Sequence, residues 1–140
     1  MNFNSNTKRP CVLFVEDQTN MAKAAQRQVT IFNENKENKT KYDIILAYDG
    51  VEALGIFKAD YFLYKSIKIL ITDQNMSMMK GIELIKYVSI YDTEKRIRLF
   101  LCSGENTLGE DYKNEIKGIN IEIIEKPLKS RDLKKILSDK

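Results

Sequence analysis

Asp73 is the residue of this chain whose position best suits chemistry. It follows the apolar run at residues 67–72, which has the length and composition of a parallel strand buried on both faces. A carboxylate at the carboxyl end of such a strand faces the edge of an open α/β sheet where ligands bind. An aspartate in this position can also serve only to cap a turn or a helix. Asp73 alone therefore leaves two alternatives open, a reactive carboxylate and a structural one.

Four further polar side chains follow other strand-like runs. Glu16 and Asp17 follow CVLFV, Ser103 follows IRLFLC, and Lys126 comes shortly after INIEII. Parallel strands place their carboxyl ends on one rim, so these side chains and Asp73 should converge there. Three neighbouring carboxylates repel one another unless a cation lies among them, and Mg²⁺ takes carboxylate oxygens together with water and phosphate oxygens. With an amine and a hydroxyl added, the set predicts a site for a tetrahedral anion beside a metal ion, suited to phosphoryl transfer.

The elements that must position these residues alternate along the chain. Strand-like runs lie at residues 11–15, 42–47, 67–72, 97–102 and 119–124. Helix-like segments begin near Thr19, Gly50, Gly81, Asn106 and Ser130. This alternation predicts an α/β fold, a flavodoxin-like, doubly wound parallel sheet of five strands in the order 2-1-3-4-5 with five helices.

Two helices and one loop carry expectations of their own. The second helix is expected to bury an apolar stripe that includes Val51 and Phe57, with Phe62 as a further candidate. The helix expected over residues 106–117 is poor in apolar side chains and should be the most weakly packed. Residues 33–41, NENKENKTK, contain no apolar side chain, which predicts a solvated loop at the end of the sheet far from the site.

Composition favours a single domain over residues 10–140, preceded by a flexible polar N-terminus over residues 1–9. The chain has 140 residues, 43% hydrophobic and 31% charged, and its net charge of +3 is spread without a basic block. We therefore expect no nucleic-acid binding by this domain. Cys11 and Cys102 lack CxxC spacing and the chain has no histidine, which favours free thiols in a cytosolic protein. No run resembles a signal peptide or a membrane span, so we expect a cytoplasmic domain without membrane contact.

Taken jointly, the motifs at the strand ends resemble those of receiver domains from two-component response regulators and hybrid histidine kinases. VEDQ supplies the acidic pair after the first strand, and TDQNMSMMKG resembles the phosphoacceptor loop. Ser103 holds the hydroxyl position after the fourth strand, and EKPL resembles the Lys-Pro end of the fifth. Each motif alone is common, but their joint placement at the right strand ends is specific. The resemblance runs from about Val12 to Leu137.

For the acidic residues, this resemblance implies a Mg²⁺ site. Asp17, Asp73 and the backbone carbonyl of Asn75 would hold the ion, and Glu16 would act through a water molecule.

The resemblance also implies a role as phosphoacceptor in a two-component or phosphorelay system. Asp73 takes a phosphoryl group from the phosphohistidine of a histidine kinase or a histidine phosphotransfer domain, and Lys126 and Ser103 bind the phosphoryl oxygens. The chain then catalyses only its own phosphorylation and dephosphorylation, and it is not an enzyme acting on other substrates. An output domain or protein can read the phosphorylated state.

Some residues depart from the family pattern or leave their role open. Ser77 stands where the family usually has proline, which loosens the turn after the phosphoacceptor without removing a ligand. Ile123 stands where a Tyr or Phe normally moves during switching, and we expect it to be a core residue of a receiver that relays phosphate. Met76, Met78 and Met79 either dock a partner or only pack the loop.

Two other functions compete with the phosphoacceptor. One is an interaction module with a receiver fold that binds partners without being phosphorylated. The other is a Mg²⁺-dependent phosphatase or nucleotide enzyme, which we rank last because the sequence contains neither GxxxxGKS/T nor GxGxxG.

Overall fold

A parallel sheet of five strands, in the order β2-β1-β3-β4-β5, forms the centre of a computed structural model that describes residues 8–104 and 108–139. The strands are β1 (Cys11–Val15), β2 (Asp43–Ala47), β3 (Ile67–Asp73), β4 (Arg98–Ser103) and β5 (Ile121–Glu125). The predicted flavodoxin-like order is confirmed, and all four strand pairings are parallel. The expected flexible segment, residues 1–9, lies outside the described residues except for Lys8 and Arg9.

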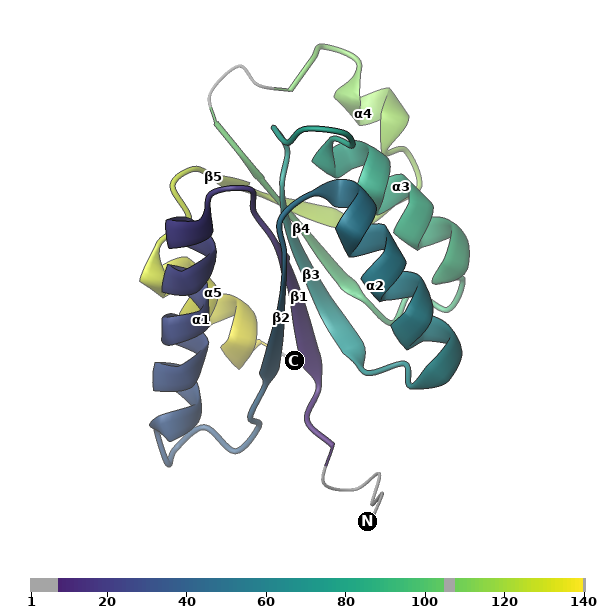
Figure 1. Cartoon of the computed structure of the whole chain (residues 1–140). Coiled ribbons are helices and arrows are strands. Elements are labelled where there is room, and N and C mark those ends of the chain that lie inside the picture. The colour runs from purple at the N-terminus through teal and green to yellow at the C-terminus, as the bar shows by residue number, and fades with distance from the viewer. Residues whose placement is uncertain (1–7, 105–107, 140) are drawn as a thin grey trace.

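In the described part of the chain, five helices cover the two faces of this sheet (Figure 1). They are α1 (Thr19–Glu34), α2 (Gly50–Leu63), α3 (Gly81–Tyr91), α4 (Tyr112–Glu115) and α5 (Ser130–Ser138). The helices α1 and α5 pack together on one face, and α2 and α3 pack together on the other, which α4 extends. Among the described residues, no helix has both the length and the apolar character needed to cross a membrane.

The strands β1 and β3 lie in the middle of the sheet because both of their faces are apolar. In β1, Leu13 and Val15 join the core beneath α2 and α3, whereas Val12 and Phe14 join the core beneath α1 and α5. In β3, Leu70 joins the core beneath α2 and α3, whereas Ile69 and Ile71 join the core beneath α1 and α5, and every residue of β1 is buried. This packing fixes the position of Asp73, the last residue of β3.

The face that α2 turns toward the sheet is narrower than predicted. Gly50, Ala53 and Phe57 are buried, whereas Val51 is 48% exposed and Phe62 is 71% exposed, so the prediction was wrong at these two positions. Phe62 follows Phe57 by five residues, which is about 140° around a helix of 3.6 residues per turn. The side chain of Phe62 therefore points away from the buried face.

The fourth helix is much shorter than the expected helix over residues 106–117, the first two of which lie outside the described part of the chain. Within the described part, the helical segment has four residues. Tyr112 and Ile116 pack against the core from partly buried positions, and none of the four helical residues is buried, as expected for weak packing. Gly118, with φ of 84°, then turns the chain toward β5.

The polar segment after α1 forms the predicted loop, except that Asn33 and Glu34 still belong to the helix. The Asn33 side chain closes this loop. It donates from Nδ2 to the carbonyl oxygen of Tyr42 at 2.8 Å, and it accepts the Tyr42 backbone N–H at 2.9 Å. The loop lies at the amino ends of the strands, on the edge of the sheet opposite Asp73 (Figure 1).

Candidate functional site

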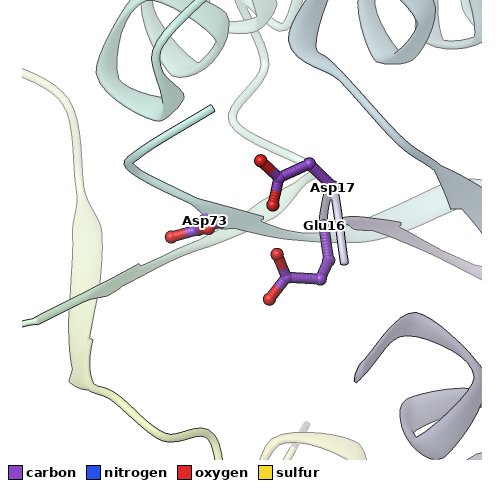
Figure 2. A group of neighbouring side chains, drawn as sticks. All are labelled: Glu16, Asp17 and Asp73. Atoms are coloured by element: carbon purple, nitrogen blue, oxygen red, sulfur yellow. The ribbon is translucent and has the colours of Figure 1, made fainter. Parts of the chain in front are cut away.

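Three carboxylates meet at the carboxyl ends of the neighbouring strands β1 and β3 (Figure 2). Glu16 and Asp17 come from the loop that leaves β1, and Asp73 ends β3. One oxygen of each carboxylate lies within 4.8 Å of the others. Glu16 and Asp73 are each only 5% exposed, whereas Asp17 is exposed to solvent. The sheet therefore holds two buried carboxylates and one exposed carboxylate at a single point.

Lys126 reaches this cluster from the other side of β4. Its Nζ lies 2.8 Å from Oδ2 of Asp73 and 3.8 Å from Oε1 of Glu16. The Lys126 backbone N–H donates to the carbonyl oxygen of Ser103 at 3.0 Å, which fixes the end of β5 against the end of β4. Burial lowers the pKa of the Lys126 amine, but the hydrogen bond and the charge of Asp73 outweigh that effect, so the pKa is raised. The amine is therefore charged where the three carboxylates meet.

The pKa of Glu16 shows that one lysine does not neutralise the cluster. Burial, hydrogen bonding to Asp17 and repulsion from Asp73 raise the pKa of Glu16 from 4.5 to about 7, although Lys126 opposes the shift. A carboxyl group with this pKa is partly protonated at neutral pH. The cluster thus carries more negative charge than its own amine can balance.

Ser103 and Asn75 flank the cluster. Ser103 is buried at the end of β4, one residue beyond Cys102, which pairs in register with Asp73. Its hydroxyl donates to the carbonyl oxygen of Gly104 at 3.1 Å. Asn75 is exposed, and its backbone N–H lies 3.4 Å from Oδ1 of Asp73. The use of the Asn75 carbonyl as a metal ligand stays a prediction.

Gln74 was not singled out from the sequence, but in the structure it lies next to Asp73 and forms hydrogen bonds with both β4 and the start of α3. Gln74 is 6% exposed, and its backbone N–H donates to the carbonyl oxygen of Cys102 at 3.0 Å. Its backbone carbonyl accepts the Gly81 N–H at 3.1 Å, and its side-chain Oε1 accepts the Ile82 N–H at 2.9 Å. The N-cap residue of α3 makes no side-chain cap, so Gln74 satisfies two N–H groups at the start of that helix. A glutamine between a strand-ending aspartate and a helix-opening glycine was the only signal in the sequence.

Gly81 allows α3 to begin directly against Asp73. A Cβ atom at position 81 would overlap the Asp73 carbonyl oxygen and would lie 2.7 Å from Cδ1 of Leu101. The close approach of α3 to the end of β3 therefore requires glycine.

The three methionines after Asp73 have different environments. Met76 is 8% exposed and Met79 packs against the core from a partly buried position, so these two pack the loop. Met78 is 77% exposed and lies beyond the core. The interpretation that these methionines pack the loop is therefore right for Met76 and Met79. Of the three, only Met78 is exposed enough to contact a partner.

Ile123 is not the core residue that we expected. It is 40% exposed in β5, the edge strand of the sheet, although its partner in register, Leu101, is fully buried. The four-residue α4 is too short to cover this part of β5, which leaves Ile123 in contact with solvent.

The residues present fit a hard divalent cation. Carboxylate oxygens are the preferred ligands of Mg²⁺, and a second positive charge would relieve the repulsion that raises the pKa of Glu16. Exposed Asp17 leaves one side of the cluster open to water and phosphate oxygens, which Mg²⁺ keeps in its coordination shell.

No protein-family model matches this chain, but known proteins are similar to it in sequence and in fold. The chain is 27% identical over 128 residues to a chemotaxis protein CheY homolog of Campylobacter jejuni, which covers 91% of this chain and 89% of that protein.

Solved structures extend the likeness. The chemotaxis response regulator CheY4 of Vibrio cholerae is 25% identical, with a TM-score of 0.68 over 92% of this chain and 96% of that one. A response regulator receiver domain protein of Clostridium thermocellum has the same fold at 18% identity, with a TM-score of 0.71 over 91% of this chain and 90% of that one. The receiver domain of the hybrid histidine kinase CckA also has this fold at 22% identity, with a TM-score of 0.65 over 91% of this chain and 94% of that one. The chain is thus similar to response regulator receiver domains over at least 91% of its length.

Proposed function

We propose that this chain is a cytoplasmic phosphoacceptor of a two-component or phosphorelay system, with Asp73 as the residue that is phosphorylated. The observation that carries the proposal is the 2.8 Å contact between the Lys126 amine and Asp73 inside a cluster of acidic side chains. An amine beside the nucleophile can bind an anion that becomes attached to that nucleophile.

The reaction that suits this arrangement is the transfer of a phosphoryl group from a phosphohistidine. A carboxylate oxygen of Asp73 attacks phosphorus in line, the new O–P bond forms as the N–P bond breaks, and the imidazole leaves. The Lys126 amine then follows the negative charge from Asp73 to a phosphoryl oxygen, and the Ser103 hydroxyl donates to another. Because both groups gain a new partner only after transfer, they also serve to report the phosphorylated state.

The metal supplies charge neutralisation for the phosphoryl oxygens when it is bound. Asp17, Asp73 and the Asn75 carbonyl would hold Mg²⁺, and Glu16 would act through a water molecule.

The proposed partners follow from this chemistry. The donor is a histidine kinase or a histidine phosphotransfer domain, and an output domain or protein reads the result. Water attacking the acyl phosphate at the same site reverses the modification, so the chain would catalyse only its own phosphorylation and dephosphorylation.

Incubation with Mg²⁺ and acetyl phosphate, followed by intact-mass measurement, tests the proposal. The wild-type chain should gain one phosphoryl group, and Asp73→Asn or removal of the metal with a chelator should abolish the gain. Asp43→Asn is the matched control, because Asp43 is the first residue of β2 and lies at the amino ends of the strands, far from the carboxylate cluster. Equal labelling of wild type and Asp73→Asn would refute the proposal.

The same measurement separates the second candidate, an interaction module that acts without phosphorylation. This candidate is favoured by the single-turn α4 and by the exposed Ile123, since both depart from the pattern expected of a switching surface. If the chain binds Mg²⁺ but accepts no phosphoryl group from acetyl phosphate or from a phosphorylated histidine domain, the second candidate replaces the first.

A further inference from the structure

Several large apolar side chains are exposed on α3 and at the C-terminal end of α2. Ten large hydrophobic side chains are exposed among the described residues, and five of them lie on α3 or at the end of α2. Phe62, Tyr64 and Ile90 are 71%, 64% and 69% exposed, and Tyr87 is 46% exposed. We define the α2–α3 patch as the following residues: Tyr61, Phe62, Tyr64, Tyr87, Ile90 and Tyr91. Apolar patches of this kind mark interaction sites more often than single exposed side chains do.

The patch is continuous across the two helices. The ring centroids of Phe62 on α2 and Tyr91 on α3 lie 6.1 Å apart, and Tyr61 lies 6.0 Å from Tyr91. On α3, Tyr87 lies one turn before Tyr91 and three residues before Ile90, so all three share a helix surface. The rings of Tyr61, Phe62 and Tyr91 therefore form one surface that spans both helices.

Lysine side chains lie over the rings of this patch. The Nζ of Lys58 is 5.6 Å from the Tyr91 ring centroid, that of Lys65 is 5.2 Å from Tyr61, and that of Lys8 is 3.7 Å from Tyr64. None of these lysines forms an ion pair with a carboxylate of the described chain.

The carboxylates near the patch have other partners. Asp60 is buried and accepts the backbone N–H groups of Ser66 and Ile67, while buried Asp92 accepts those of Arg96 and Ile97. Arg96 also pairs with Glu94 at 2.5 Å. Exposed Glu52 and Glu83 lie in the first turns of α2 and α3, whereas the rings that the lysines cover lie at the C-terminal ends of these helices. The patch is therefore both apolar and positively charged.

The patch lies away from the carboxylate cluster. Both α2 and α3 run back from the carboxyl edge of the sheet, so their C-terminal ends lie near the amino ends of the strands (Figure 1). Asp73 stands at the opposite edge. No described hydrogen bond or ion pair of the patch involves Glu16, Asp17, Asp73 or Lys126.

We propose that the α2–α3 patch docks an acidic, amphipathic segment of a partner protein, and that this docking is independent of phosphorylation at Asp73. Exposed aromatic rings provide anchors for the apolar face of such a segment, as large aromatic side chains do at interfaces. Lys8, Lys58 and Lys65, which have no carboxylate partner within the described residues, provide the complementary charge for its acidic face. The patch thereby binds one partner while the carboxylate cluster around Asp73, at the carboxyl ends of the strands, stays accessible to a second partner.

A synthetic amphipathic peptide provides a direct probe. One fluorescein-labelled peptide carries Leu and Phe on one helical face and Glu on the other, and a matched peptide carries Lys in place of Glu. We expect the full chain to bind the acidic peptide more tightly than the basic one. Backbone amide shifts should be confined to the second half of α2, α3 and the residues around Lys8. Added salt should weaken the binding because the lysine contribution is electrostatic.

Variants localise the surface without disturbing the core. Phe62→Ala and the double change Lys58→Glu/Lys65→Glu should each weaken binding by about tenfold or more, the loss typical of a hot-spot residue. Ile31→Ala and Lys36→Glu are the matched controls, because Ile31 is 57% exposed on α1 and Lys36 is exposed in the loop that follows. Both controls should bind as the wild type does. Asp73→Asn should also bind unchanged, with or without Mg²⁺, whether or not Asp73 proves to be a phosphoacceptor.

Four results would overturn the proposal. They are equal binding of both peptides, unchanged binding by the patch variants, amide shifts centred on the carboxyl edge of the sheet, and no peptide binding at all. Parallel titrations with anionic phospholipid vesicles and with single-stranded DNA distinguish other occupants. Patch-dependent binding to either of these in place of the acidic peptide would also contradict the proposal.

Discussion

The acidic and the basic halves of the candidate site come from parts of the fold that differ in packing. The strands β1 and β3, which supply the carboxylates, each pair with two neighbours and are covered by helices on both faces. The strand β5, after which Lys126 follows, is an edge strand without a single buried residue, and its neighbour α4 is a single turn. The carboxylates are thus held by tertiary packing, whereas the described contacts of Lys126 are a backbone hydrogen bond to Ser103 and ion pairs with Asp73 and Glu16.

This difference implies that a change of charge at the site moves β5 more easily than it moves β1 and β3. The centre resists movement because its side chains are closely packed on both faces. The edge can shift at low cost because few buried contacts are lost. Mutations at the centre should therefore cost far more free energy of unfolding than mutations at the edge.

Among changes at or directly beside the carboxylate cluster, the largest effect is expected for Gly81→Ala. The added Cβ atom meets the Asp73 backbone and the Leu101 side chain, so the free energy of unfolding should fall by about 3 kcal/mol. Gly55→Ala is the matched control, because its Cβ meets nothing within 4 Å in the middle of α2. It should raise stability by about 0.5–1 kcal/mol. Urea unfolding measures the free energy of unfolding of both variants. If Gly81→Ala is as stable as the wild type, the packing around β1 and β3 adjusts to an added atom as easily as the packing around β5.

The next effect concerns pH and Glu16 in the metal-free protein. Its pKa is raised from 4.5 to about 7 on folding, so the folded state holds the proton more tightly than the unfolded state. The resulting stability is complete below pH 4.5, declines as the pH rises, and is lost above about pH 7. Glu16→Gln removes this dependence, and at pH 8 it should be more stable than the wild type by on the order of 1–3 kcal/mol.

Thermal unfolding in the presence of a chelator, at pH 5 and at pH 8, measures this difference. Glu37→Gln, in the loop after α1, should behave like the wild type at both pH values. If the stability of Glu16→Gln relative to the wild type is the same at pH 8 as at pH 5, repulsion among the three carboxylates does not raise the pKa of Glu16.

A smaller effect is expected for Gln74→Ala, which removes the side-chain acceptor at the start of α3. Loss of a helix cap of this kind should cost about 1–2 kcal/mol. Because Asn75 follows directly, the change should also weaken Mg²⁺ binding in a calorimetric titration. Gln26→Ala, exposed on α1, provides the control for both measurements. If Gln74→Ala changes neither the stability nor the Mg²⁺ affinity, Gln74 neither stabilises the start of α3 nor positions the metal site.

The smallest effect belongs to the edge. Ile123→Ala should cost less than about 1 kcal/mol because the side chain is already 40% exposed. Leu101→Ala, at the position paired with Ile123 in β4, should cost about 2–5 kcal/mol because Leu101 is fully buried. Urea unfolding measures both changes. If Ile123→Ala and Leu101→Ala lower the free energy of unfolding by similar amounts, β5 is packed as tightly as the centre of the sheet.

The central strands and the convergence of polar ends could be predicted because they depend on local pattern and topology alone. An unbroken apolar run bounded by acidic residues allows few placements in a parallel sheet, so the meeting of Glu16, Asp17 and Asp73 followed from the strand order.

Other features depend on which neighbour covers which surface, and a pattern read along the chain does not contain that information. Phe62 fits an apolar stripe in the sequence, yet it points away from the buried face of α2. Ile123 has core composition but lies on an edge that a short α4 leaves open. Gln74 acts through contacts with β4 and α3 that exist only after folding.

The central claim, that Asp73 accepts a phosphoryl group within this acidic cluster, is tested most directly by borohydride trapping. Reduction of an aspartyl phosphate yields homoserine, which peptide mass spectrometry locates to a single position. After incubation with acetyl phosphate and Mg²⁺, homoserine should be found at position 73 in the wild type and should be absent when a chelator is present. Homoserine at another acidic residue, or at none, would contradict the account.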